Sequence, residues 1–195
     1  MAFVRDLGYP APAVEEVRDD GLAIVMERID GGTMVDALMR RPWSARSQGR
    51  LLGELHTQLH ALRAPPWAED APMGSGDRML HLDLHPLNVM IGRHGPVVID
   101  WTNARRGDPA VDVALSWAIV AAGQVETNRL VGKLATRLRS SLLSGFLSVV
   151  DREDAARALR LAVTWKVRDA NLSADEQAAM WRLVQQVDPR ETSAP

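Results

Sequence analysis

Cysteine, lysine and long apolar runs are scarce in this sequence, which contains no cysteine and only two lysines, Lys133 and Lys166. Without cysteine, disulfides, thiolate catalysis and cysteine-bound zinc are excluded. Lys and Arg total 23 against 25 Asp and Glu, so no basic excess favours nucleic acid or an anionic membrane as a partner. The most apolar stretch, residues 113–123, is about half the length that spans a bilayer and is typical of a buried helix. We therefore expect a soluble, cytoplasmic protein.

Hydrophobic periodicity indicates an α+β chain in which helices dominate. Of the 195 residues 46% are hydrophobic, which is enough for one domain or two small lobes. Residues 21–29 are rich in β-forming residues and end at Asp-Gly-Gly, which predicts a strand. A capping box of Thr33 and Asp36 begins a short helix. Further helices are expected at 44–62, 109–122, 126–149, 152–168 and 173–187, with a loop at 64–77.

Polar side chains are concentrated in residues 81–91, HLDLHPLNVMI, immediately before a strand-like run. We predict a β-hairpin of 88–91 and 97–100, with the turn at 92–96, which sets Asn88 opposite Asp100 and buries Val89, Ile91, Val97 and Ile99 on one face. Asp83 lies on the preceding loop, which Pro86 keeps from being helical. Three hard oxygen donors would then converge on one site for Mg²⁺. So few protein ligands bind this ion tightly only when substrate phosphates complete its coordination.

Three segments together resemble the catalytic segment of the aminoglycoside phosphotransferase and choline kinase family: HLDLHPLN, the later VVIDW and the following GDPAVDVA. In that family the blocks usually read H-G-D-L-H-P-x-N, I-D-W and G-D-P-x-x-D-L-A. Leu82 stands here in place of the usual glycine, and Thr102 stands where glutamate or glycine is common. The resemblance covers about residues 20–125 and implies the C-terminal lobe of a protein-kinase-like fold, with a catalytic loop, a short β-hairpin and a preceding hinge strand.

The resemblance also implies a function, the transfer of the γ-phosphoryl group of ATP to a hydroxyl of a small molecule such as an aminoglycoside or choline. In this reaction Asp83 would be the catalytic base. The other implied roles are binding of Mg²⁺ by Asn88 and Asp100, support of the catalytic loop by His81, His85 and Asp112, and contact with adenine by the backbone at Glu27, Arg28 and Ile29.

Most of the upper lobe of such a kinase has no counterpart in this sequence. Only residues 1–20 precede the predicted strand, and none of them is the lysine that pairs with the ATP phosphates. We expect residues 1–30 to be a remnant of the N-terminal lobe with its hinge, and residues 31–195 to form the helical lobe. The expected consequences are an open upper face that favours self-association and weak activity of this chain alone. A start inside a longer gene or at a cloning boundary, a degenerate relative and an upper lobe from another chain all fit this pattern.

Two other classes of function stay open at this point. One is a non-catalytic, pseudokinase-like binding module. The other is a metal-dependent hydrolase, because His81, Asp83 and His85 alternate and in a strand would face one side. A second histidine pair, His56 and His60, lies one helical turn apart without a nearby third ligand, so we expect it to serve packing or a surface role rather than to bind a metal.

Metal analysis of the purified protein separates the kinase from the hydrolase. The kinase reading predicts weak Mg²⁺ binding that depends on nucleotide. One equivalent of tightly bound zinc would contradict it and support the hydrolase.

Overall fold

The computed structural model describes residues 1–21, 23–123 and 129–187. Its helices are α1 (Ala2–Asp6), α2 (Met34–Arg40), α3 (Ala45–Ala61), α4 (Pro109–Ala122), α5 (Arg129–Phe146), α6 (Arg152–Lys166) and α7 (Ala174–Val187). Its strands are β1 (Val14–Arg18), β2 (Ala23–Met26), β3 (Gly31–Thr33), β4 (Arg78–Leu80), β5 (Val89–Gly92), β6 (Gly95–Val98) and β7 (Arg105–Gly107). The expected α+β fold, mainly helical with small antiparallel sheets that include a short hairpin, is confirmed.

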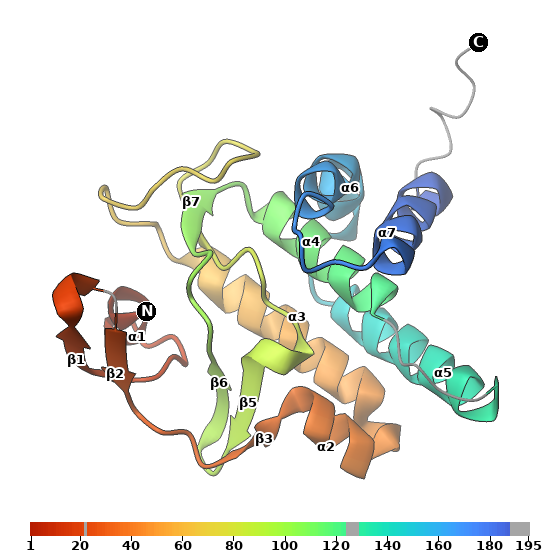
Figure 1. The fold of residues 1–195 in the computed structure, drawn as a ribbon, viewed down its shortest axis with the longest axis horizontal. Helices are drawn as coiled ribbons and strands as arrows, with labels where there is room; N and C mark the ends of the chain where they lie inside the picture. The colour runs from red at the N-terminus through yellow and green to blue at the C-terminus, as the bar shows by residue number, and fades with distance from the viewer. Residues whose placement is uncertain (22, 124–128, 188–195) are drawn as a thin grey trace.

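Helix α4 forms the centre of the helical part of the molecule. It lies between α3 on one side and α6 and α7 on the other (Figure 1). Its residues are buried on almost every face, including Leu115 and Trp117, which explains why the sequence shows an apolar run there rather than an amphipathic pattern. The helix begins at Pro109, and the side chain of Asp108 accepts a hydrogen bond from the backbone of Ala110.

The helices predicted from periodicity form close to the expected positions. The capping box of Thr33 and Asp36 is present at the start of α2, with hydrogen bonds in both directions. The first residues of the predicted helix 126–149 lie outside the described residues, and the described part, α5, ends at Phe146. No helix in the described segments combines the length and apolar character needed to cross a membrane.

Glycines bring helices α3 and α5 into backbone contact. A Cβ placed on Gly49 would lie 1.9 Å from the carbonyl oxygen of Leu142, and one on Gly145 would lie 2.0 Å from that of Arg46. Such distances leave no room for a side chain, so this crossing depends on glycine. The contact fixes the position of α3, the helix that carries His56 and His60 toward the candidate site.

The predicted hairpin forms with a register one residue away from the expected one. A two-residue turn, Arg93 and His94, replaces the expected five-residue turn, and Gly95 follows it with φ of +125°, a conformation that glycine adopts most readily. Val89 therefore pairs with Val98, and both are fully buried.

The shift corrects two of our expectations. The buried residue of the second strand is Val98, whereas Val97 and Ile99 are only partly buried. Asn88 lies in a 3₁₀ turn (Pro86–Asn88) and accepts a backbone hydrogen bond from Ile99 rather than facing Asp100. Both turn lengths satisfy the sequence at 92–96, and burial of the Val89–Val98 pair favours the shorter one.

The N-terminal residues pack on the core, which the sequence does not reveal. Val4, Tyr9 and Ala11 are buried, and the Tyr9 ring meets Trp101 edge-on at 5.6 Å between centroids. The predicted strand at 21–29 is shorter, β2, and pairs with an unexpected partner, β1. These two strands lie beside α1 and apart from the other helices, at the N-terminal end of the molecule (Figure 1).

Replacement of Gly49 by alanine tests the backbone contact between α3 and α5. We expect a loss of about 1–3 kcal/mol in the free energy of unfolding, because the methyl group has to displace the Leu142 carbonyl. Urea denaturation measures this effect. Gly132→Ala is the matched control, since it also lies on a helix but has no atom within 4 Å of its would-be Cβ, and it should gain about 0.5–1 kcal/mol. Equal losses in the two variants would contradict the close contact.

Candidate active site

The loop at residues 81–85 is held in place by the buried carboxylate of Asp112. One of its oxygens accepts the backbone N–H of Leu82 at 2.7 Å, and the other accepts the backbone N–H of His81 at 3.0 Å. Leu82 has φ of +61°, the left-handed region in which a leucine is strained by about 1–3 kcal/mol. Two charge-assisted hydrogen bonds offset this strain.

The carboxylate of Asp112 remains ionised although it is fully buried. Burial by itself would raise its pKa, but the hydrogen bond from His60 at 2.9 Å, the neighbouring imidazoles and the backbone hydrogen bonds outweigh burial and hold the pKa well below its usual range. His60 belongs to α3, so one carboxylate on α4 ties that helix to the loop. The two histidines, expected to serve packing or a surface role, instead hydrogen-bond neighbouring elements of the fold.

His56 completes a second link between the same elements. Its Nε2 lies 2.8 Å from the hydroxyl of Ser116, which donates to the carbonyl of Leu84 in the loop at 2.6 Å. Burial lowers the pKa of His56 to about 4, and the nearby Asp112 only partly opposes that shift. The imidazole is therefore neutral at pH 7.

Asp83, the predicted base, projects from this loop beside two nitrogen groups. Its carboxylate lies 3.2 Å from the ammonium group of Lys166 and 3.7 Å from Nε2 of His85. Burial would raise the pKa of Asp83, but the nearby imidazole of His85 and the charge of Lys166 lower it to about 2. The carboxylate is thus ionised at any physiological pH.

Asn88 lies against Asp83, as the spacing in the sequence suggested. Its amide nitrogen donates to the Asp83 carbonyl oxygen at 2.9 Å and lies 3.5 Å from the Asp83 carboxylate. The 3₁₀ turn that begins at Pro86 brings these two residues together. Of the three residues predicted to supply oxygen ligands, Asp83 and Asn88 are thus in direct contact.

Asp100 lies at the same end of the hairpin. It follows Ile99, the backbone hydrogen-bond partner of Asn88. Its backbone has φ of +59°, its side chain is exposed and one oxygen accepts the hydroxyl proton of Thr102 at 2.9 Å. The strained backbone turns the chain out of β6 just after Ile99. Because Ile99 hydrogen-bonds Asn88, Asp100 follows directly on the strand end next to the loop.

His81 and His85 have different surroundings and do not form a metal site with Asp83. His81 is buried against Trp101, and its Nε2 donates to the carbonyl of Ile99 at 3.0 Å, whereas His85 faces Asp83. Across the described ranges no group of three or more His, Asp or Glu side chains is placed to hold a metal ion. The strand geometry on which a zinc or iron hydrolase of His81, Asp83 and His85 depended is absent, since residues 81–85 form no strand and Leu82 has φ of +61°.

The residues predicted to meet adenine lie at the opposite end of the hairpin from Asn88. The chain segment of Glu27, Arg28 and Ile29 connects β2 to β3, and β3 pairs with β5 so that Gly31 is opposite Gly92. The backbone N–H of Glu27 donates to Ala13, and its side chain pairs with Arg5. The Arg28 side chain pairs with Asp30 in solvent.

Lys166 is the residue of this site that the sequence did not point to. It ends α6, and its side chain is 10% exposed, with its ammonium group between the carboxylates of Asp83 and Asp169 at 3.2 Å from each. Lys166 is 83 residues from Asp83 in the sequence, so no local pattern connects them. The one feature of the sequence that could have drawn attention to Lys166 is the scarcity of lysine.

Comparisons with known proteins agree with the resemblance seen in the catalytic segment. Residues 67–142 match the model of the phosphotransferase enzyme family. Over 68 residues the chain is 38% identical to the uncharacterised protein YcbJ of Bacillus subtilis (strain 168), a match that covers 33% of this chain but only 22% of that protein. The likeness to an aminoglycoside phosphotransferase-type fold is thereby confirmed for this part of the chain.

One solved structure is similar over most of the chain at low identity. The amicoumacin kinase hAmiN, solved in complex with AMP-PNP, Ca²⁺ and Ami, aligns with 97% of this chain and 76% of its own at 13% identity and a TM-score of 0.46. A likeness at that level carries no argument about activity.

The buried His56 predicts how stability changes with pH. Its folded pKa of about 4 lies below the ordinary value of 6.5, so between these values the unfolded chain binds the proton more readily. The free energy of unfolding should therefore fall as the pH is lowered from about 6.5 to about 4, by up to about 3 kcal/mol from this group. Buried His81, whose pKa is also lowered, adds to the effect with the same sign.

Urea denaturation across this pH range checks the expectation. His56→Gln should flatten the pH dependence even if it lowers stability overall, because the residue no longer titrates. His94→Gln, which alters an exposed histidine of the hairpin turn, is the control and should leave the slope unchanged. An unaltered slope in the His56 variant would contradict this account.

Proposed function

We propose that this chain, which matches the phosphotransferase enzyme family over residues 67–142, transfers the γ-phosphoryl group of ATP to a hydroxyl of a small molecule. The observation that carries the proposal is the contact between Asp83 and Asn88 on a loop fixed by Asp112. Phosphoryl transfer depends mainly on positioning and on neutralising charge, so a rigidly held carboxylate and amide are what it requires of this loop.

Asp83 is the proposed base. Its carboxylate is ionised, so it can accept a hydrogen bond from the acceptor hydroxyl and orient the oxygen toward phosphorus. The new O–P bond forms as the bond from the γ-phosphorus to ADP breaks, and the hydroxyl proton passes to Asp83. His81, His85 and Asp112 are proposed to support the loop, for which the hydrogen bonds of Asp112 are the main argument.

Asn88 and Asp100 would hold Mg²⁺. Both offer hard oxygen donors at one end of the hairpin, and Asp100 is exposed to an incoming ligand. Two protein donors suit an ion whose coordination is completed by phosphates rather than a closed protein site. When bound, Mg²⁺ offsets the negative charge of the phosphate groups.

The adenine is assigned to the segment of Glu27, Arg28 and Ile29. Strand β5 separates this segment from Asn88, and its four residues span about 13 Å, a distance that an extended nucleotide bridges. Because the Glu27 N–H already binds Ala13, Glu27 would contribute its carbonyl oxygen, with Arg28 and Ile29 contributing their backbone groups. The division at residue 30 and the cytoplasmic location remain predictions.

A non-catalytic binding module is the second candidate. The pairing of Lys166 with Asp83 favours it, because a lysine engaged by the base is not directed at a phosphate. Nucleotide binding without transfer to any acceptor would support this candidate over the phosphotransferase.

Asp83→Asn should separate binding from transfer. We expect phosphoryl transfer, followed by ³¹P NMR with a panel of hydroxyl acceptors, to fall by about 10²–10⁴-fold, since the base is lost. Calorimetry should find Mg²⁺–ATP bound as in the unaltered chain, because Asp83 meets the hydroxyl rather than the phosphates. Asn88→Ala and Asp100→Asn should instead weaken Mg²⁺–ATP binding.

Asp77→Asn is the matched control for these variants, since Asp77 is an exposed carboxylate of the preceding loop. It should change neither binding nor transfer. Failure of the unaltered chain to bind Mg²⁺–ATP, or full transfer by the Asp83 variant, would contradict the proposed function.

A further inference from the structure

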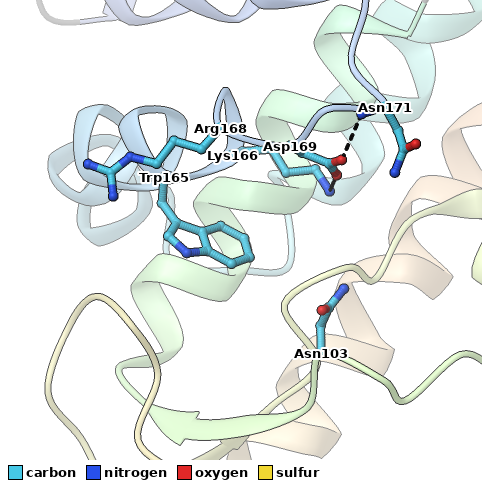
Figure 2. Close-up of a pocket in the computed structure, with 6 residues that line it drawn as sticks. All are labelled: Asn103, Trp165, Lys166, Arg168, Asp169 and Asn171. Atoms are coloured by element: carbon cyan, nitrogen blue, oxygen red, sulfur yellow. Dashed lines mark hydrogen bonds and ion pairs between the residues drawn. The ribbon is translucent and has the colours of Figure 1, made fainter.

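Lys166 connects the proposed base to the wall of a pocket. The pocket has a volume of about 430 Å³ and is lined by Asn103, Trp165, Lys166, Arg168, Asp169 and Asn171. Figure 2 shows Lys166 and Asp169 side by side in this wall, whereas the guanidinium of Arg168 extends to the opposite side. The ammonium group of Lys166 lies 3.2 Å from the Asp83 carboxylate, so it contacts the base as well as lining the pocket.

The side chain of Lys166 has a fixed position at the end of α6. It is only 10% exposed, and a buried ammonium group is costly unless it is paired. A second carboxylate pairs with it, because Asp169 also lies at 3.2 Å from the ammonium group. The other oxygen of Asp169 accepts the backbone N–H of Asn171 at 3.0 Å, which holds that carboxylate in place. The ammonium group is therefore fixed between two carboxylates.

The two oxygens of the Asp83 carboxylate have different surroundings. Oδ1 accepts the hydrogen bond from Lys166 at 3.2 Å. Oδ2 lies 3.5 Å from the amide nitrogen of Asn88 and 3.7 Å from Nε2 of His85, distances at which a hydrogen bond is weak or absent. Among the residues that the structure describes, none thus gives Oδ2 a short hydrogen bond. This oxygen can accept one from a hydroxyl group.

The direction of Oδ2 matters for the proposed reaction. Asn88 is proposed to act on the phosphate side of the site, and Oδ2 is the Asp83 oxygen that faces it. The torsion about the Cβ–Cγ bond of an aspartate is broad, and rotation about it would exchange the two oxygens. Lys166 opposes this rotation, because its ammonium group keeps one oxygen as its partner.

We infer that Lys166 is a positioning residue for the proposed transfer: it holds Oδ1 of Asp83 and so presents Oδ2 to the hydroxyl group of the acceptor. The hydroxyl proton passes to Oδ2 as the hydroxyl oxygen bonds to the γ-phosphorus and the bond from that phosphorus to ADP breaks. This role rests on the proposed function for its reaction, and it applies to any acceptor that offers a hydroxyl group.

Steady-state transfer by Lys166 variants tests this role. Lys166→Met should lower kcat by about 10–10²-fold, because the base loses its orientation, and should leave the KM for Mg²⁺–ATP within about twofold. Lys166→Arg keeps a donor for Asp83 and should retain more transfer, so the role can be tested even if the Met variant fails to fold. Arg168→Met is the matched control, since it removes an exposed positive charge that points away from Lys166, and it should change neither constant.

Chemical rescue separates lost positioning from a damaged fold. Lys166→Ala leaves space for a small ammonium ion, and ethylammonium should raise its rate of transfer by about tenfold by donating to Oδ1. Tetramethylammonium carries the same charge without an N–H group and should not restore transfer. Equal rescue by the two ions would contradict the hydrogen bond that positions Asp83.

The ammonium signals of the chain report the contact without nucleotide. The sequence has two lysines, so a ¹H–¹⁵N spectrum of the lysine ammonium groups contains at most two signals, and Lys166→Arg identifies that of Lys166. Asp83→Asn should shift this signal, because the ammonium group loses a charged partner. Asp77→Asn, which alters an exposed carboxylate, should leave it unchanged.

The outcomes distinguish this role from the proposed function. Transfer by Lys166→Met at the rate of the unaltered chain, or a Lys166 signal that does not respond to Asp83→Asn, would overturn the inference and leave the phosphotransferase proposal intact. If the unaltered chain transfers to no acceptor of the panel, the proposed function fails and the positioning role fails with it. A shift of the Lys166 signal in Asp83→Asn would in that case show that the ion pair is present without the reaction.

Discussion

The candidate site depends on the buried carboxylate of Asp112. It accepts two backbone hydrogen bonds from a loop that is strained at Leu82, and it takes a third from His60 on a different helix. A charge without water has to be satisfied by fixed donors, and these donors belong to the segments that must be held together. The loop therefore has one well-defined position, which is the condition for any chemistry at Asp83.

The packing of the helices also helps to hold the loop in its position. The glycine contacts between α3 and α5 bring their backbones together, which fixes α3 and hence His56 and His60. His56 reaches the loop through Ser116 and the carbonyl of Leu84. Two polar links thus connect α3, α4 and the loop, and His56, Asp112 and Ser116 in these links are fully buried.

Local patterns in the sequence predicted most of the fold correctly. Features that depend on neighbouring residues can be predicted from the sequence. They include the capping box at Thr33, the buried helix at residues 113–123 and the helices that follow. The hairpin was predicted with the wrong register, because residues 92–96 permit two turn lengths. Only burial of Val89 against Val98 distinguishes them, and burial is a property of the folded chain.

The candidate site shows the same division. Sequence spacing pointed to Asp83 and Asn88, because both lie on one loop whose course Pro86 restricts. It also suggested a hydrolase triad in which His81 and His85 face one way, and the structure separates these two residues. Roles that depend on how two distant elements pack together could not be predicted from sequence spacing.

The sequence by itself determined the helical character of the chain, the loop that carries Asp83 and the likeness to a phosphotransferase family, since each rests on residues close together in the chain. The tertiary structure alone decided that Lys166, 83 residues away, lies against Asp83 and that a pocket opens beside them. The physical reason is that an ion pair between distant residues forms only after helix α6 has packed on α4.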